Sequence, residues 1–327
     1  MNAQFTEFVR AVARGRRLGR SLDIGEAERA MGMIMDGEAT PEQVGAFLMV
    51  LRYRVETSKE IAGFVRAARK RMAIQTLLDV DLDWPSYADH HRQLPWFVLA
   101  ARLLAENGVR IVMHGIEGAG TATTRAALRA MDVPVARDGE VLRTALDRGL
   151  VYVPLEDLCP LMQRLFDLKR LFGLRSCVHT MARELNPFGA PAQIQGVFHP
   201  DYLELHRGIQ RWLDQPAAIT FKGGGGEGQR NPCKPCDVRV LRHGESFDES
   251  WSSLTEGEGY PWREEPLDVR RLRALWQGEW SAEAPRRAVT GTAAMCLWLT
   301  RRVATPAAAE SMAEAMWLKR APLAVAA

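Results

Sequence analysis

The N-terminal part of the chain, up to residue 72, has apolar positions at helical spacing between residues that typically begin and end helices. Asp23, Thr40 and Thr57 are each followed three residues later by Glu or Gln, which is the pattern of a capping box. Gly37 is a natural stop, because glycine tolerates the left-handed backbone that ends many helices. A fourth helix, around residues 5–12, is expected to precede these three. The pattern predicts a helical subdomain.

From residue 94 onward the pattern alternates between helices and short apolar strands. Residues 94–107 predict a buried helix, because they are apolar on most sides, and residues 109–113 predict a strand. A glycine-rich turn over residues 114–120 is expected to lead into a helix over residues 121–131. The other predicted elements are strands at 151–153, 218–222 and 238–241 and helices around 158–172 and 201–214. This alternation favours an α/β fold in which helices cover a mainly parallel sheet.

Length and composition fit a protein of two domains. The chain has 327 residues, more than one typical domain, and 47% of them are hydrophobic. We expect a helical domain over residues 1–72, which can include a later helix inserted from the α/β domain, and an α/β domain over residues 73–327. No run of about 18 apolar residues predicts a membrane span. Five scattered cysteines and the lack of a signal-peptide pattern predict reduced thiols and a cytoplasmic protein.

Two stretches carry a specific resemblance to a known family. Residues 37–69, GEATPEQVGAFLMVLRYRVETSKEIAGFVRAAR, resemble the N-terminal domain of the anthranilate phosphoribosyltransferase family, which has the glycosyltransferase family 3 fold. Residues 168–200 are similar to a second family stretch, in which Gly173, Arg175 and Asn186 keep their places. The resemblance implies a nucleoside phosphorylase/phosphoribosyltransferase-like fold and a homodimer formed through the N-terminal helices.

The positions that bind pyrophosphate and magnesium in that family differ in this chain. The family cradles pyrophosphate in a glycine-rich turn, whereas residues 84–92 here, WPSYADHHR, contain no glycine. The family's acidic magnesium pair is matched by residues 221–232, where only Glu227 is acidic. Ile116 and Lys169 replace an asparagine and the anthranilate-contacting arginine. We therefore expect no ordinary anthranilate transferase activity, no assignable catalytic residue, no metal site and no cofactor, with magnesium needed only if transferase activity is retained.

A divergent branch of the family, which has members that bind nucleic acid, is more similar to this chain. It carries a Pro-Ser-Tyr segment in place of the pyrophosphate turn, as does this chain at residues 85–87. The resemblance implies a homodimer that binds single-stranded DNA or RNA. Candidate phosphate- or nucleic-acid-binding residues are Tyr87, Arg92, His114, Gly115, Thr121, Thr124, Arg164, Lys169, Arg170, Arg175 and Lys222.

Charge and aromatic residues give this hypothesis partial support. The net charge of +3 is weak evidence, but basic residues gather near the N-terminus and over residues 164–183. Trp84, Tyr87 and Trp96 are candidates to stack on unpaired bases. Tryptophans nearer the C-terminus are expected to be packing residues, namely Trp276, Trp280, Trp298 and Trp317.

Two other functions stay open. One is a glycosyl or phosphoribosyl transferase with an altered donor or acceptor, which would hold phosphate at residues 118–124 and the following helix N-terminus. The other is the anthranilate enzyme itself. Residues 223–228 are rich in glycine and could wrap a phosphate, although a mobile loop is the simpler interpretation.

Two clusters of potential metal ligands have simpler explanations. Cys233 and Cys236 form a lone Cys-x-x-Cys pair without the second pair of ligands that zinc needs, so we interpret them as chance thiols. His90 and His91, beside Asp89, are expected to be exposed rather than metal-bound.

Overall fold

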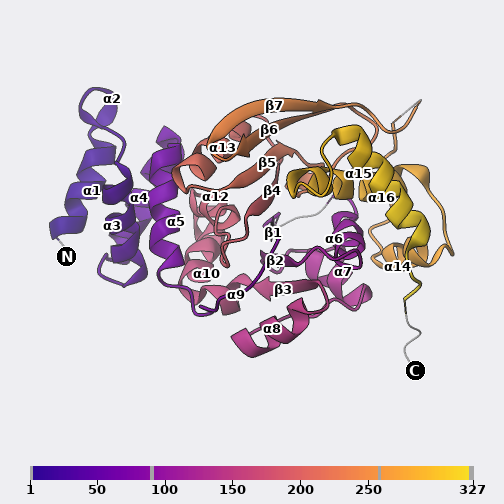
Figure 1. The fold of residues 1–327 in the computed structure, drawn as a ribbon. Coiled ribbons are helices and arrows are strands. Elements are labelled where there is room, and N and C mark those ends of the chain that lie inside the picture. The colour runs from indigo at the N-terminus through magenta and orange to yellow at the C-terminus, as the bar shows by residue number, and fades with distance from the viewer. Residues whose placement is uncertain (1–2, 89–91, 257–258, 324–327) are drawn as a thin grey trace.

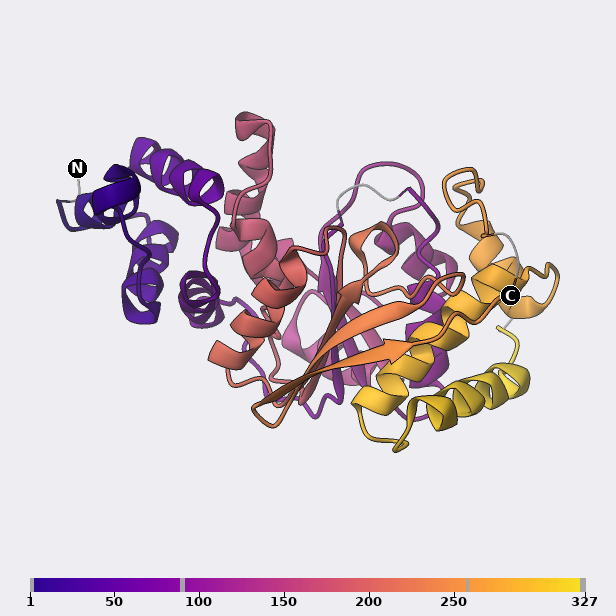
Figure 2. The same ribbon diagram turned by 90° about the horizontal axis from the view of Figure 1, so that it is seen from above.

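The computed structural model describes residues 3–88, 92–256 and 259–323. Asp89, His90 and His91 therefore lie outside the described residues. A bundle of helices, indigo to purple in Figure 1, lies beside a larger domain in which helices cover a sheet. Seen from above, the bundle lies at one end of the molecule and the C-terminal helices lie at the other (Figure 2). The helices of the bundle are α1 (Ala3–Ala13), α2 (Gly15–Leu18), α3 (Ile24–Met35), α4 (Pro41–Arg54) and α5 (Ser58–Arg69).

The three predicted capping boxes are confirmed, and they explain where α3, α4 and α5 begin. The side chains of Asp23, Thr40 and Thr57 each accept a hydrogen bond from the backbone N–H three residues later. The Glu or Gln at that later position accepts one from the backbone N–H of the cap. Gly37 follows the end of α3 with φ +76°, which glycine adopts without strain. Local sequence signals thus determine the helices of the bundle.

The sheet has seven strands in the order β3-β2-β1-β4-β5-β6-β7. The first five strands in this order run parallel, and β6 and β7 are antiparallel additions at one side. The predicted α/β fold with an N-terminal helical part and a mainly parallel sheet is confirmed. The strands are β1 (Leu82–Ser86), β2 (Ile111–Gly115), β3 (Leu150–Pro154), β4 (Ala192–Val197), β5 (Ala217–Lys222), β6 (Cys236–Arg242) and β7 (Glu245–Trp251).

Helices cover both faces of this sheet. On one face α6 packs against α15, and on the other face α12 and α13 lie between the sheet and α5 of the bundle. The helices outside the bundle are α6 (Phe97–Ala105), α7 (Thr124–Ala130), α8 (Gly139–Leu146), α9 (Leu155–Leu158), α10 (Pro160–Asp167), α11 (Lys169–Phe172), α12 (Val178–Arg183), α13 (Tyr202–Trp212), α14 (Arg270–Gln277), α15 (Glu283–Leu299) and α16 (Pro306–Lys319).

The predicted packing role of the C-terminal tryptophans is confirmed for three of the four. Trp276, Trp298 and Trp317 are buried between the C-terminal helices and the sheet. Trp280 is only half-buried, and its ring stacks on that of Trp96 at 6.1 Å between centroids. Among the described residues, no helix is both long and apolar enough to cross a membrane.

The largest difference from the sequence expectations is that residues 84–86, part of the segment compared with the family's pyrophosphate turn, lie in the central strand β1. Proline is unusual inside a central strand because it cannot donate a hydrogen bond to its neighbour. Pro85 is tolerated because β4 pairs with β1 only at Leu82 and Asp83, so the pairing on that side ends before the proline. The other side of β1 pairs with β2 along its whole length.

Several other elements differ in their bounds or were not expected. Strand β4 was missed because glutamines alternate with its apolar residues, and β7 because it is mostly polar. The helix expected around residues 158–172 is divided into α9, α10 and α11, with Pro160 beginning the second. Helix α7 begins three residues later than expected because Thr123, and not Thr121, accepts the capping hydrogen bond.

Candidate functional site

Four parallel strands end side by side, and ligands of α/β folds usually bind outside the carboxyl ends of such strands. β1 ends at Ser86, β2 at Gly115, β4 at Val197 and β5 at Lys222. The strand register pairs Ser86 with Gly115 and Val197 with Lys222. The residues that follow these strands therefore lie close together, and we call this region the carboxyl edge.

Three buried polar side chains form a chain at the ends of β1 and β2. The Tyr87 hydroxyl lies 2.7 Å from His114 Nδ1, and His114 Nε2 lies 3.2 Å from Asp83 Oδ1. All three residues are almost completely inaccessible, and burial raises the pKa of the Tyr87 phenol well above its usual value. Neither Tyr87 nor His114, both predicted binding residues, is exposed to a ligand here.

The turn after β2 is joined to β1 by a buried hydroxyl pair. Ser86 Oγ and Thr124 Oγ1 lie 2.7 Å apart. A Cβ atom at Gly115 would lie 2.0 Å from the Ser86 carbonyl oxygen, so only glycine fits there. Thr121 is exposed, but its hydroxyl donates to the Leu267 carbonyl at 3.0 Å. The structure brings these predicted residues together, yet it occupies them with internal contacts.

The glycine-rich segment after β5 is a packed turn, which contradicts the interpretation as a mobile loop. A Cβ atom at either Gly196 or Gly223 would lie 1.8 Å from the Glu227 carbonyl oxygen, so this carbonyl lies directly against two glycines. The Gly223 N–H donates to the Val197 carbonyl at 3.0 Å, and a short 3-10 helix, η1 (Gly224–Gly226), follows. The backbone of the turn therefore fills the space beside β4 and β5.

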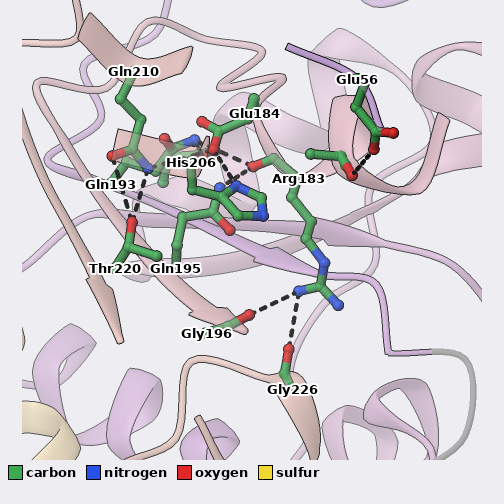
Figure 3. A network of polar contacts seen from close by, with 12 residues as sticks. Glu56, Arg183, Glu184, Gln193, Gln195, Gly196, His206, Gln210, Thr220 and Gly226 are labelled. Carbon is green, nitrogen blue, oxygen red and sulfur yellow. Dashed lines mark hydrogen bonds and ion pairs between the residues drawn. The ribbon is translucent and has the colours of Figure 1, made fainter. Parts of the chain in front are cut away.

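Arg183, at the end of α12, holds this turn against β4. Its guanidinium Nη1 donates to the Gly196 carbonyl at 3.2 Å and to the Gly226 carbonyl at 3.0 Å (Figure 3). The side chain is buried, and the Arg183 carbonyl in turn accepts hydrogen bonds from the amides of Gln193 and Gln195. One buried guanidinium thus ties the end of a strand to the following turn.

A second group of buried polar residues lies next to Arg183 in Figure 3. Glu184 contacts His206 Nδ1 at 2.5 Å, and the Gln210 amide donates to Thr220 Oγ1 at 3.3 Å. Gln193 also donates to Asp83 Oδ2 at 2.8 Å, which connects this group to the chain through His114. The sheet face toward α12 and α13 therefore carries buried polar side chains beside apolar ones such as Val112.

Glu227 is the one acidic residue of the segment that the family resemblance matched to a magnesium pair. It is completely buried, and its Oε1 accepts a hydrogen bond from the Ala88 N–H at 2.6 Å. Burial raises the pKa of Glu227 to about 7, although the charge of Arg183 and the Ala88 N–H act in the opposite direction. The charge of Arg175 acts in the same direction as that of Arg183.

The backbone that follows β1 is held by three buried side chains. Besides the bond from Ala88 to Glu227, the Leu94 N–H donates to Glu265 Oε1 at 2.6 Å and the Phe97 N–H donates to Gln229 Oε1 at 2.9 Å. Burial raises the pKa of Glu265 as well. These acceptors fix both ends of the segment between β1 and α6.

The remaining predicted residues are basic and lie at the surface. Arg164 is exposed on α10 and Arg170 is exposed on α11, and neither forms an ion pair with any described residue. Arg92, Arg175 and Lys222 are also exposed, and Lys169 is half-exposed. In Figure 2 helices α10 and α11, coloured rose, project away from the sheet. We call these exposed cations, together with the exposed Asp167 between Arg164 and Arg170, the basic surface of the carboxyl edge.

The expectation that Trp84, Tyr87 and Trp96 stack on bases is wrong. Each is at most 1% exposed, because these rings form part of the core. Sequence reasoning also missed Asp83 as a site residue and counted Arg183 only as part of a basic stretch. A carboxylate between the apolar residues Leu82 and Trp84 was the available signal for Asp83, and no local pattern indicated the contacts of Arg183.

No described group of three or more His, Cys, Asp or Glu residues could hold a metal ion. Cys233 and Cys236 are free thiols, the first half-buried and the second buried. Burial raises the pKa of Cys236 to about 11, which disfavours the thiolate.

The chain is similar to known proteins in both domains. Residues 6–72 match the glycosyl transferase family, helical bundle domain. An anthranilate phosphoribosyltransferase of Moorella thermoacetica is 30% identical over 230 residues, which cover 69% of this chain and 68% of that protein.

Two solved structures show the same fold. Anthranilate phosphoribosyltransferase from Thermus thermophilus superimposes with a TM-score of 0.78 at 21% identity, covering 97% of this chain and 94% of that one. The Saccharomyces cerevisiae enzyme in complex with PRPP and Mg gives a TM-score of 0.76 at 13% identity, covering 98% and 94%. The shared sequence and fold show that this chain belongs to the anthranilate phosphoribosyltransferase family.

Proposed function

We propose that this protein binds single-stranded nucleic acid at the basic surface around its carboxyl edge, and that it does so as a homodimer. Nucleic-acid backbones are polyanions, and cations that neutralise phosphates supply most of the sequence-independent affinity. In this proposal the chain keeps the family fold, and nucleic acid is the ligand at the carboxyl edge, where α/β folds usually bind ligands.

The observation that carries this proposal is the row of exposed cations on α10, α11 and the adjoining loops. Arg164 and Arg170 have no acidic partner among the described residues, so their charge is available to a phosphate. Elsewhere on the surface many arginines are neutralised, as Arg207 is by Glu204 and Asp248. A local excess of positive charge is consistent with an overall charge of only +3.

The interior of the carboxyl edge supports a loss of pyrophosphate binding. A phosphate in a backbone cradle needs free N–H groups and close approach. The Gly223 N–H is bonded to Val197, the Gly224 N–H donates to the Gln229 carbonyl at 2.7 Å, and the Thr123 hydroxyl caps α7. Glu117, which accepts from Thr123, would also repel a phosphate at this helix end.

The residues present do not fit magnesium. This ion prefers several oxygen ligands and usually keeps some of its water. Glu227 is buried, its Oε1 already accepts the Ala88 N–H, and no second carboxylate completes a group among the described residues. We therefore assign no step to a metal.

Binding of a fluorescent 20-nucleotide oligo(dT) at rising salt tests the proposal. Wild-type affinity is expected to fall steeply with salt, and the double substitution Arg164→Glu and Arg170→Glu is expected to weaken binding at least tenfold. The dependence of log affinity on log salt should also become shallower, by about 0.7 for each phosphate that is no longer neutralised.

Arg148→Glu is the matched control, because Arg148 is exposed just before β3 and therefore lies at the opposite, amino edge of the sheet. It should leave binding nearly unchanged. Wild-type binding that is absent, or that does not respond to salt, would overturn the proposed function.

Dimer formation through the bundle is the second part of the proposal. Leu18 is 72% exposed and Tyr53 is 90% exposed, and burying such apolar side chains against a second copy would be favourable. Sedimentation should show a wild-type dimer, and Leu18→Asp combined with Tyr53→Asp should yield monomers. A wild-type monomer at micromolar concentration would contradict this part.

A transferase with an altered donor or acceptor is the second candidate, and the names of the similar proteins favour it. Lys222, exposed at the end of β5, is a cation that could bind a sugar phosphate. Isothermal titration with phosphoribosyl pyrophosphate and magnesium distinguishes the two functions. Clear binding would favour the transferase over the nucleic-acid ligand.

A further inference from the structure

One aromatic ring at the carboxyl edge is exposed although its neighbours are buried. Phe198 directly follows β4, and it is 50% exposed, whereas Trp84, Tyr87 and Trp96 are at most 1% exposed. A half-exposed phenylalanine at the ligand-binding side of a sheet loses hydrophobic stabilisation that burial would provide. Its ring is therefore available to a ligand on this side of the sheet.

The position of Phe198 is fixed by the packed turn. A Cβ atom at Gly226 would lie 3.3 Å from the Phe198 Cβ, so the ring begins directly beside the turn. The carbonyl of the same glycine accepts from Arg183, and the neighbouring Val197 is held by the Gly223 N–H. This backbone is therefore anchored on both sides, and the ring needs little ordering when a ligand binds.

The surroundings of the ring are basic and polar. The register places Lys222 beside Val197, immediately before Phe198, and Lys222 is exposed. His199 is exposed as well, and its ring meets the Phe198 ring edge to face at 4.9 Å between centroids. Arg175, between α11 and α12, is exposed as well. An aromatic face next to cations is the combination that single-strand binders use for a base and its phosphate.

We infer that Phe198 is a stacking platform for one unpaired base, while Lys222 binds an adjacent phosphate. The inference rests on the proposed nucleic-acid function and adds how that site selects single strands. In a duplex, both faces of a base are covered by its neighbours, so a duplex cannot present an interior base to this ring. The platform therefore predicts that the protein prefers single strands.

Conservative substitutions at Phe198 test the platform. Phe198→Leu keeps an apolar side chain of similar size but removes the aromatic face, and it is expected to weaken binding to oligo(dT) roughly tenfold. Phe198→Trp provides a larger aromatic face and should bind oligo(dT) at least as tightly as wild type. Phe247→Leu is the matched control, because Phe247 is also partly exposed, at 36%, but lies on the antiparallel strand β7. It should leave affinity unchanged.

Two measurements on the wild-type protein test the Phe198 platform even if a variant folds poorly. Wild-type protein should bind a 20-nucleotide single strand more tightly than a duplex of equal length. Irradiation of wild-type protein with an oligonucleotide carrying one 5-iodouracil should yield a crosslinked peptide that contains Phe198.

These experiments distinguish a failure of the Phe198 platform from a failure of the proposed nucleic-acid function. If wild type binds with a salt dependence that Arg164→Glu and Arg170→Glu reduce, but Phe198→Leu binds like wild type, the platform is overturned and the proposed function stands. If wild type binds no oligonucleotide, both are overturned.

Discussion

The two faces of the central strands differ in chemistry although both are buried. On the face toward α6 and α15 the strands present Leu82, Trp84, Ile194 and Phe221 to an apolar core. The face toward α12 and α13, which we call the polar face, carries apolar residues such as Val112 but also several polar side chains of β1, β2, β4 and β5, and these are Asp83, His114, Gln193, Gln195 and Thr220. The first face provides burial of apolar area, and the second provides directional contacts.

The two faces therefore have different roles: the apolar face mainly stabilises the fold, and the polar face holds backbone and side chains at defined positions. Apolar contacts are nondirectional and tolerate changes of similar volume. Buried hydrogen bonds require their partners at defined positions, since an unpaired group is penalised. The polar face ends at the carboxyl edge, where Arg183 holds the turn beside Phe198. We conclude that the polar face sets the geometry of the proposed binding surface.

The largest expected effect is on the apolar face. Trp84→Ala should lower the free energy of unfolding by about 4 kcal/mol, because Trp84 is completely buried in β1 and stacks on Phe97 at 6.1 Å between centroids. Urea unfolding followed by circular dichroism measures the change. A loss below about 1 kcal/mol would show that this face does not dominate stability.

The next effect concerns pH and Glu227. Its pKa of about 7 in the folded state lies above the usual 4.5, so the folded protein keeps a proton that the unfolded chain releases between these values. The free energy of unfolding should therefore decrease as pH rises from about 4.5 to 7 and then level off, with a total change of up to about 3 kcal/mol.

Glu227→Gln removes this dependence while keeping an oxygen acceptor for the Ala88 N–H. Urea unfolding at pH 5 and at pH 7.5 should show a smaller difference for this variant than for wild type. Glu245→Gln, at an exposed carboxyl, is the control. Equal pH dependence in wild type and Glu227→Gln would refute a raised pKa of Glu227.

Arg183→Met should lower the free energy of unfolding by about 2 kcal/mol, because two backbone carbonyls lose a charged donor. It should also raise the pKa of Glu227 further, since Arg183 lowers it in wild type. The midpoint of the pH dependence of unfolding would then move upward. Arg148→Met, at an exposed site, should change neither the free energy of unfolding nor this midpoint. A midpoint that does not move in Arg183→Met would contradict an influence of Arg183 on the pKa of Glu227.

The smallest effects compare neighbours on one strand. Thr220→Val loses a hydrogen bond with Gln210, and Ile219→Val loses a methylene on the opposite face. Each should lower the free energy of unfolding by about 1 kcal/mol. Binding separates them, because Thr220→Val alone alters the polar face. If both variants change oligonucleotide affinity equally, the polar face has no special role in binding.

The helices of the bundle were predictable from sequence, whereas the burial of the central strands β1 and β4 was not. Capping boxes such as Thr57 with Glu60 are local, so their signals lie within one helical turn. The burial of Gln193 depends on Asp83, which is distant in sequence, and nothing near Gln193 indicates that contact. Trp84 and Phe198 have similar aromatic character, and only the tertiary structure shows that the first is buried and the second exposed.

Helix α12 connects two distant parts of the molecule, and this has a consequence for local unfolding. Thr180 donates to Glu56, in the link between α4 and α5, at 3.2 Å, and Arg183 of the same helix holds the turn after β5 (Figure 3). Neither the bundle nor this turn can open without breaking contacts of α12. Amide protons in α5, α12 and the turn should therefore exchange with solvent deuterium at a common rate, as one cooperative unit.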